Sequence, residues 1–218
     1  MRSSHSGQVY IPHDLALFFT ILIVSSIVAA SVTWLYLNPR PVEEFFALGV
    51  LGENMMAEHY YPGDDPRIGP GELVQWHVTL YNHMGSAQYV SVRVKLLNQT
   101  TPPPDDMNHT PSSVPFFKEI AHVFVDNETW VFPFYWSVEN VSWSGGSAKI
   151  TAVNLNNVTI TQGLDTTAQD GYNFRIVLEL WAYGNETTGF QFGWRSGEEV
   201  RSAWNQIWFN LTAPTAST

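Results

Sequence analysis

Two histidines and a methionine in the stretch "WHVTLYNHMGSAQYVSVRVKLLNQT" are the residues that come nearest to a metal-ligand set. His77, His83 and Met84 carry the nitrogen and thioether donors that copper accepts. An extended strand rises about 3.3 Å per residue, so the two imidazoles stand roughly 20 Å apart. Metal–nitrogen bonds are about 2 Å long, so one ion cannot bind both unless the chain folds back between them. We therefore assign no metal ligand here, and the absence of cysteine excludes a blue-copper thiolate.

The segment "NHMGS", residues 82–86, has the Asn and Gly that a tight turn requires. Alternating apolar residues on both sides predict two antiparallel strands joined in a hairpin, with Val78 and Val92 buried. His77 is expected on the outer face of the first strand, and His83 at the turn.

Acidic and nucleophilic residues give no catalytic constellation. The loop 63–72 holds Asp64, Asp65 and Glu72, without the alternating oxygen ligands typical of calcium loops, so calcium binding there stays open. The chain has no G-x-S-x-G elbow, and nothing places two carboxylates at a working distance in a cleft. We predict no catalytic residue, no cofactor and no enzymatic activity.

Composition restricts the partners. The chain of 218 residues has 10 Lys+Arg against 20 Asp+Glu, a net charge of -10, and its basic residues are scattered. Nucleic-acid binding needs a basic patch, so no nucleic-acid partner is predicted. Disulfides and thiolate metal sites are excluded because there is no cysteine.

The segment "LALFFTILIVSSIVAASVTWLYL", residues 15–37, is free of charge and long enough to cross a bilayer. It predicts a transmembrane helix between a cytoplasmic tail (1–14) and a juxtamembrane linker (38–44), so the bilayer itself is a partner. "IVAAS" also offers small residues for signal-peptide cleavage, and whether the segment is cleaved stays open. Ser26 and Ala30, one turn apart, are candidate packing positions against another helix.

N-glycosylation sequons give the orientation. Seven Asn-X-Ser/Thr sequences occur, whereas composition alone predicts about two, and all follow the apolar segment. They predict an extracellular, glycosylated C-terminal domain and a cytoplasmic N-terminus. The glycan acceptors would be Asn98, Asn108, Asn127, Asn140, Asn157, Asn185 and Asn210.

Most of the remaining chain alternates with period two and predicts eight or nine strands. Short strands without intervening helices indicate an all-β, antiparallel sandwich over residues 45–212, followed by a tail at 213–218. Only "SGEEVRSAW", residues 196–204, has the pattern of a helix, with Ser196 as N-cap.

The nine tryptophans are expected mainly in the core. Trp143, in "NVSWSGG", has the most exposed surroundings and is the candidate platform for a sugar ring. A carbohydrate-binding or adhesion module is therefore the alternative function.

Five sequence features resemble an archaeal family of membrane proteins, the domain-of-unknown-function family sixteen-sixteen. The similarity spans about residues 45–138, and Met84 and Gly85 depart from the family's pattern after the histidine. It implies a membrane-anchored, immunoglobulin-like extracytoplasmic domain without known catalytic residues. The features correspond to Leu48–Gly52, Tyr61–Pro62, Asn82–His83, Val90–Val94 and Asn127–Trp130.

Together these features predict a single-pass, glycosylated cell-envelope protein whose outward β-sandwich acts in protein–protein contacts or as an accessory subunit. Its expected partners are other envelope or membrane proteins.

Overall fold

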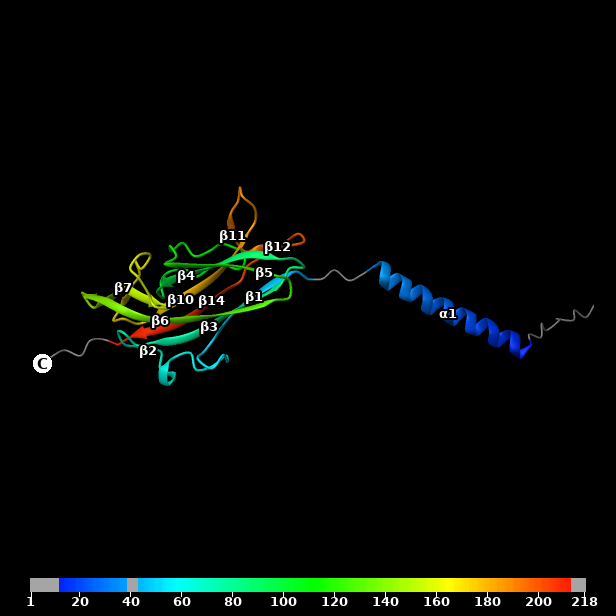
Figure 1. The fold of residues 1–218 in the computed structure, drawn as a ribbon, viewed down its shortest axis with the longest axis horizontal. Coiled ribbons are helices and arrows are strands. Elements are labelled where there is room, and N and C mark those ends of the chain that lie inside the picture. Colours follow the sequence, from blue (N-terminus) through cyan, green and yellow to red (C-terminus); the bar gives the residue numbers. More distant parts are fainter. Residues whose placement is uncertain (1–11, 39–42, 213–218) are drawn as a thin grey trace, which may run out of the picture. The chain divides into compact units, whose positions relative to one another are not determined.

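The computed structural model describes residues 12–38 and 43–212 (Figure 1). The outer parts of the predicted N-terminal tail, most of the linker and the C-terminal tail at 213–218 lie outside the described residues. The chain divides into two compact units, with the boundary between Val42 and Glu43. Each unit is described by itself below.

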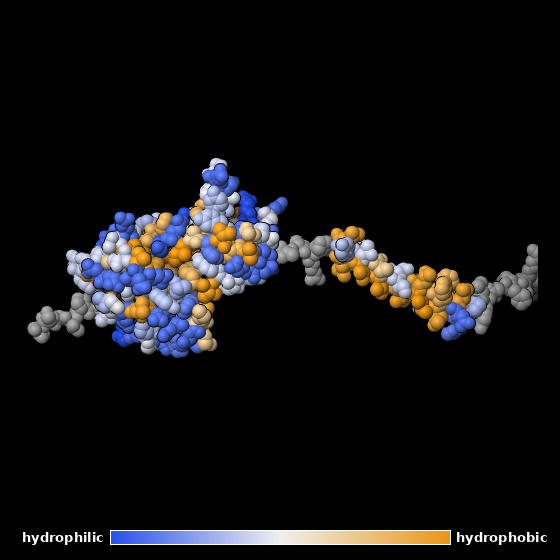
Figure 2. Space-filling view, in the orientation of Figure 1, coloured by the Kyte–Doolittle hydropathy of each residue, from blue (hydrophilic) through white to orange (hydrophobic). Residues whose placement is uncertain are grey.

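The first unit contains the helix α1 (His13–Leu37), which has 25 residues and no buried side chain. It is long and apolar enough to cross a membrane, a property that it shares with signal sequences. Its apolar surface is plain in Figure 2. The hydroxyls of Thr20, Ser26, Ser31 and Thr33 each donate to the carbonyl four residues earlier, so these polar groups are satisfied within the helix.

The second unit is mostly β, as predicted, and has two six-stranded sheets and a separate hairpin. The first sheet contains β1 (Phe45–Leu51), β3 (Val74–His83), β6 (Thr129–Ser144), β7 (Ser147–Leu155), β8 (Val158–Ile160) and β9 (Thr167–Gln169). The second contains β2 (Arg67–Ile68), β4 (Gln88–Leu97), β5 (Lys118–Phe124), β10 (Phe174–Tyr183), β11 (Phe190–Phe192) and β14 (Trp204–Leu211). The hairpin is β12 (Trp194–Ser196) and β13 (Glu199–Arg201), and a short 3-10 helix, η1, covers Pro62–Asp64.

The two sheets share one hydrophobic core, which makes them a sandwich. The alternation read from the sequence is confirmed, because alternate residues of β3, β4 and β10 are fully or almost fully buried. In this core, Trp76 and Trp136 pack edge to face with centroids 5.1 Å apart, and Phe209 of the opposite sheet packs on Trp136 at the same distance.

The predicted hairpin at residues 82–86 is wrong, although the turn itself is present. β3 pairs with β1 and β6, whereas β4 pairs with β5 and β10, so the turn carries the chain from one sheet to the other. Two alternating strands with a short turn are compatible with both arrangements, since each buries the same side chains. Val78 and Val92 are both buried, as predicted, but in opposite sheets.

The predicted helix at residues 196–204 is also wrong. The segment forms the turn and second strand of the β12–β13 hairpin, followed by the start of β14. Gly197 at the turn has φ +60, a backbone conformation that favours a hairpin turn over a helical first turn. The structure has more strands than predicted, because several of them have only two or three residues and are too short to show alternation. One pairing also differs from the antiparallel prediction, since β2 pairs with β14 in parallel.

The loop 98–117 is attached to the outer face of the second sheet by a buried ion pair. Lys95 and Glu179 lie 2.9 Å apart with almost no exposed side-chain area. Ser112 of the loop accepts from the Lys95 ammonium through its carbonyl (2.6 Å) and donates its N–H to Glu179 (2.9 Å). The loop is thereby held in place, and it supplies two side chains of the site described next.

Candidate interaction site

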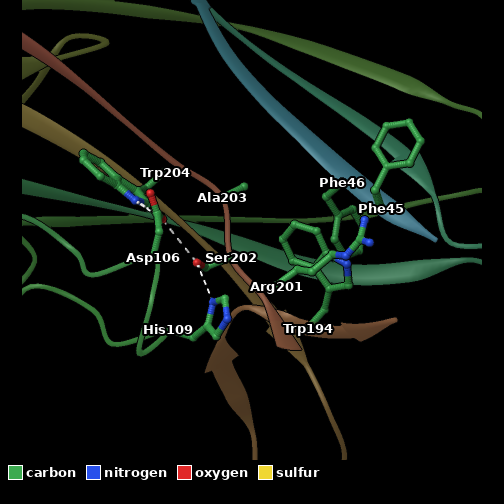
Figure 3. Close-up of a pocket in the computed structure, with 9 residues that line it drawn as sticks. All are labelled: Phe45, Phe46, Asp106, His109, Trp194, Arg201, Ser202, Ala203 and Trp204. Carbon is green, nitrogen blue, oxygen red and sulfur yellow. Dashed lines mark hydrogen bonds between the residues drawn. The ribbon is translucent and has the colours of Figure 1, made fainter. Parts of the chain in front are cut away.

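A hollow of about 580 Å³ lies where β1 begins, beside the β12–β13 hairpin, the start of β14 and the loop 98–117 (Figure 3). Its lining combines aromatic, charged and hydroxyl side chains: Phe45, Phe46, Asp106, His109, Trp194, Arg201, Ser202, Ala203 and Trp204.

One wall of the hollow is apolar. The rings of Phe46 and Trp194 pack edge to face, with centroids 5.1 Å apart, and Phe46 also stacks on Phe124 at 6.0 Å. Phe46 and Trp194 are each at least nine-tenths buried, so they connect the lining of the hollow to the core. The indole N–H of Trp194 is buried and makes no hydrogen bond within the described residues.

The other wall is a hydrogen-bonded group of polar side chains. Trp204 donates its indole N–H to the Asp106 carboxylate at 2.5 Å. The Ser202 hydroxyl donates to the same oxygen at 3.4 Å and lies 3.1 Å from Nδ1 of His109. The carboxylate thus contacts the serine and not the histidine, whereas a Ser-His-Asp triad places the histidine between the other two. The group orders the loop against β14.

Arg201 lies on the side of the apolar wall (Figure 3) and is held by two carboxylates. Its guanidinium is paired with Glu43, and with Glu199 at 3.1 Å. The hydrogen bond to Glu43 is the main reason that the pKa of Arg201 is raised, followed by the bond to Glu199. The hollow therefore contains a fixed guanidinium, its charge compensated by the two carboxylates, beside Trp194, its cross-strand neighbour.

The outer face of the second sheet carries a further aromatic group. Tyr89, Tyr183 and Phe190 lie on three adjacent strands, with ring centroids 4.9–5.6 Å apart. Their planes are inclined by 50–75°, so the three rings do not form a flat surface. Tyr89 is 40% exposed and Tyr183 is 36% exposed.

The two histidines of the opening stretch have separate partners. His77 was expected on an outer face, but it is buried, because the carbonyl of Gly52 (3.3 Å) and the Tyr135 hydroxyl (3.3 Å) cover it. His83 donates to the side-chain oxygen of Asn127 at 2.7 Å. Each imidazole thus takes part in ordinary hydrogen bonding.

The acidic loop 63–72 directs its carboxylates to different places. Asp64 lies 2.8 Å from His59, Asp65 pairs with Arg67 at 2.7 Å, and Glu72 accepts from the N–H of Gly69 at 2.8 Å. Within residues 12–38 and 43–212, no three His, Asp or Glu side chains come together as a metal site would require. The three acids therefore do not converge on one point.

The sequon asparagines differ in exposure. Five of them are exposed, namely Asn108, Asn127, Asn140, Asn157 and Asn185. Asn98 and Asn210 are half-buried. The amide of Asn98 donates to the carbonyl of Thr167 at 2.8 Å, and its oxygen accepts from Thr100 and Thr101. The oxygen of Asn210 accepts from the N–H of Asn173 at 2.8 Å.

The other candidate residues lie as follows. Ser26 and Ala30 are exposed on α1, and the Ser26 hydroxyl bonds the Leu22 carbonyl. The expectation that Trp143 is the most exposed tryptophan is wrong, because Trp143 is half-buried against the core. In the β unit Trp208 is more open, at 39% exposure.

Two segments of the family resemblance meet in space. Asn127 donates its backbone N–H to the carbonyl of Asn82 at 2.7 Å, and Asn82 donates to the carbonyl of Glu128 at 3.1 Å. The fully buried side chain of Asn82 also donates to three carbonyls, those of Ser86, Phe124 and Val125. The asparagine thus fixes the inter-sheet turn.

No sequence pattern indicates the hollow. Its polar wall joins residues that are 93 to 98 positions apart, and hydrogen bonds across such separations leave no local spacing. The one sequence signal was "RSAW", residues 201–204, which was assigned to a helix.

No family model and no curated protein matches the chain. Among solved structures, the CARDB domain of a Pyrococcus furiosus protein, in complex with di-metal ions, has a TM-score of 0.36 and 12% identity, and covers 78% of this chain and 94% of its own. A β-glucosidase from Listeria innocua in complex with gluconolactone has a TM-score of 0.30 and 10% identity, and covers 78% and 16%. The C-terminal domain of wzt has a TM-score of 0.31 and 7% identity, and covers 82% and 85%. These low scores give no information about the chemistry of the hollow.

Proposed function

We propose that the protein is a single-pass, N-glycosylated cell-envelope protein whose β-sandwich faces outward and binds other envelope or membrane proteins through the hollow. The apolar helix α1 supports an anchor, and the five exposed sequon asparagines support an extracellular side. The two sheets around one core support an immunoglobulin-like domain, and the resemblance to the archaeal membrane-protein family stays a prediction, since no family model matches.

The observation that carries the proposal is the composition of the hollow. Tryptophan and arginine are the residues most enriched among binding hot spots, and here Trp194, Trp204 and Arg201 line one concave surface. An apolar wall beside hydrogen-bonding groups suits a partner's side chain with a polar end. The polar wall lacks the arrangement of a catalytic triad, and we propose binding without catalysis.

Site-specific crosslinking in native membranes tests the proposal. A photoreactive phenylalanine analogue replaces Phe45, at the edge of the hollow, and in a matched control it replaces the exposed Tyr172. We expect a discrete protein adduct from position 45 and none from position 172. Equal labelling from both positions, or none from position 45, contradicts binding at the hollow.

Sugar binding is the second candidate, and no observation favours it. The half-exposed rings of Tyr89, Tyr183 and Phe190 are inclined to one another, whereas a stacking platform needs a flat face. Trp143, the candidate from the sequence, packs against the core.

A further inference from the structure

We propose that β5 is a strand-addition site, at which an extended segment of a basic partner protein pairs with the open edge of the second sheet. This surface, the β5 edge, comprises residues 118–125. It shares no lining residue with the hollow, although Phe124 stacks on Phe46 through the core, and it goes beyond the function proposed above.

The β5 edge lacks the features that protect exposed strands. β5 is the last strand in the order β2-β14-β10-β4-β5, so its outer side has no paired strand among the described residues. Natural edges are protected by shortness, proline or charge. β5 has seven residues without proline, and Lys118 and Glu119 are its only charged residues. The other outer strands β2 and β8 have two and three residues.

Exposed apolar side chains distinguish the β5 edge from β1, the other seven-residue edge. Val123 is 60% exposed and Val125 is 61% exposed, whereas no large apolar side chain of β1 is among the exposed ones. A strand with an unpaired outer side and exposed valines is the arrangement that strand addition uses, because main-chain hydrogen bonds give affinity and alternate side chains give specificity. Val125 contributes its side chain alone, since its N–H donates to Glu128 and its carbonyl accepts from Asn82.

The apolar surface continues from the edge across the sheet. Val123 lies opposite Tyr89, Tyr89 contacts Tyr183, and Tyr183 lies opposite Phe190. Figure 2 shows hydrophobic surface at the base of the projecting loop that joins β10 to β11. A strand added beside β5 would extend this row by one residue. The side chain of Val123 and the side chain opposite it on the added strand would both be removed from water.

Charge favours a basic partner over a second copy of this chain. The β unit carries 19 of the chain's 20 acidic residues and 8 of its 10 basic ones, so it is strongly acidic. Asp126 and Glu128 follow the β5 edge, and within the described residues neither has a cationic partner. Two copies would bring these carboxylates and their acidic surfaces together, whereas Lys or Arg on a partner would complement them.

The test uses short peptides of alternating Val and Thr and the full chain in mild detergent. The protein comes from a host without N-glycosylation, because the sequon Asn127 lies two residues beyond Val125. The first peptide has two N-terminal lysines, which antiparallel pairing would bring to Asp126. A second has glutamates there, and a third has the lysines and N-methyl groups on alternate amides. We expect the lysine peptide to bind about tenfold more tightly than the glutamate peptide, and the N-methylated peptide not to bind.

Protein variants locate the binding. Val123→Lys and Val125→Lys add charge at exposed positions and should each weaken binding of the lysine peptide about tenfold while leaving the melting temperature unchanged. The matched control is Val158→Lys, on the edge strand β8 of the other sheet, where the side chain is 52% exposed. It should leave the affinity within about twofold.

Three results would each overturn the proposal: no binding of the lysine peptide at millimolar concentration, equal binding of the N-methylated peptide, or equal effects of the lysines at positions 123 and 158. Self-association that Val123→Lys abolishes would identify a second copy as the occupant instead. Crosslinking from position 45 is independent of these results, so either proposal can fail alone.

Discussion

Gly52 directly follows β1, at a point where two backbone segments meet. A Cβ at this position would lie 2.0 Å from the carbonyl oxygen of Glu58 and 2.5 Å from that of His59. The carbonyl of Gly52 lies 3.3 Å from Nδ1 of His77 and so helps to cover a histidine that was expected on an outer face. The glycine in the resemblance motif "LGVLG" thus has a steric reason.

The Gly52→Ala change is expected to destabilise the sandwich by about 3 kcal/mol or more, because backbone atoms must move to admit the methyl group. Gly63→Ala is the control: Gly63 has φ +60 but open space around it, so the cost is limited to about 1–2 kcal/mol of backbone strain. Denaturant unfolding of both variants measures the difference. Equal loss in the two would refute the steric explanation.

The Lys95–Glu179 pair gives a second prediction at this scale. Lys95→Met leaves a carboxylate that is fully buried and without its cation, which is expected to cost about 3–5 kcal/mol. Adding Glu179→Gln removes the charge and keeps one acceptor oxygen for one of the two N–H donors, those of Ser112 and Trp181, so part of the loss should be recovered. Urea melts of the single and double variants provide the measurement. A double variant no more stable than Lys95→Met would show that the charge is not the cause.

Among the elements, the loop 98–117 determines whether the polar wall of the hollow exists. Within it, the carboxylate of Asp105 accepts from the side chain of Asn108 at 2.6 Å and from the N–H groups of Met107 and Asn108. The hydrogen bond from the Asn108 side chain is the main reason that the pKa of Asp105 is lowered. This turn places Asp106 and His109 toward β14.

A lowered pKa in the folded state means that the Asp105 carboxylate stabilises the loop above its ordinary pKa near 3.8, and that this stabilisation disappears as the pH falls through the folded value. We expect Asp105→Asn to lower stability at neutral pH and to reduce the further loss between about pH 4 and pH 2. Asn108→Ala, which removes the main donor, should act in the same direction. Thermal melts across this range test it; an unchanged acid response in Asp105→Asn would be the opposing result.

The strands and turns also show which parts of the fold could be predicted from the sequence and which could not. Period-two alternation identified the long strands, since burial of one face repeats at every second residue. It could not choose between a hairpin and an inter-sheet turn at residues 82–86, because pairing partners are set by distant strands. "SGEEVRSAW" had acids and a possible N-cap, yet Trp194 and Arg201 pair across a hairpin whose other strand lies earlier in the chain. The hollow depends on that hairpin, and so it was missed as well.

At the scale of the whole molecule, the exposure of each sequon asparagine indicates whether it can carry a glycan. A glycan on Asn98 would replace one of the two hydrogens on the amide nitrogen that now donates to Thr167, in a half-buried position. We expect glycopeptide mass spectrometry of the native protein to show occupancy at the exposed Asn157 and Asn185 and little at Asn98. High occupancy of Asn98 in a protein of unchanged stability would contradict this reading. Unmodified sequons throughout would instead remove the main support for an extracellular domain.

The division of the chain at Glu43 gives the last prediction. The hydrophobic core is built from residues between Phe46 and Leu211, so the sandwich needs nothing from α1 to bury its apolar side chains. A fragment that begins at Glu43 should therefore stay soluble without detergent. It should unfold cooperatively at the same urea midpoint as the full chain in detergent.

The full chain is expected to remain in the membrane fraction after an alkaline wash, because α1 is long enough to span the bilayer core. Peptides from residues 1–14 recovered from the membrane-bound protein would show that α1 is retained as an anchor. A mature protein that begins after residue 30 and is released by the wash would instead identify α1 as a signal sequence. The sandwich would then act free of the membrane, and its partners would have to be sought among soluble envelope proteins, with the hollow and the β5 edge unchanged as the surfaces to test.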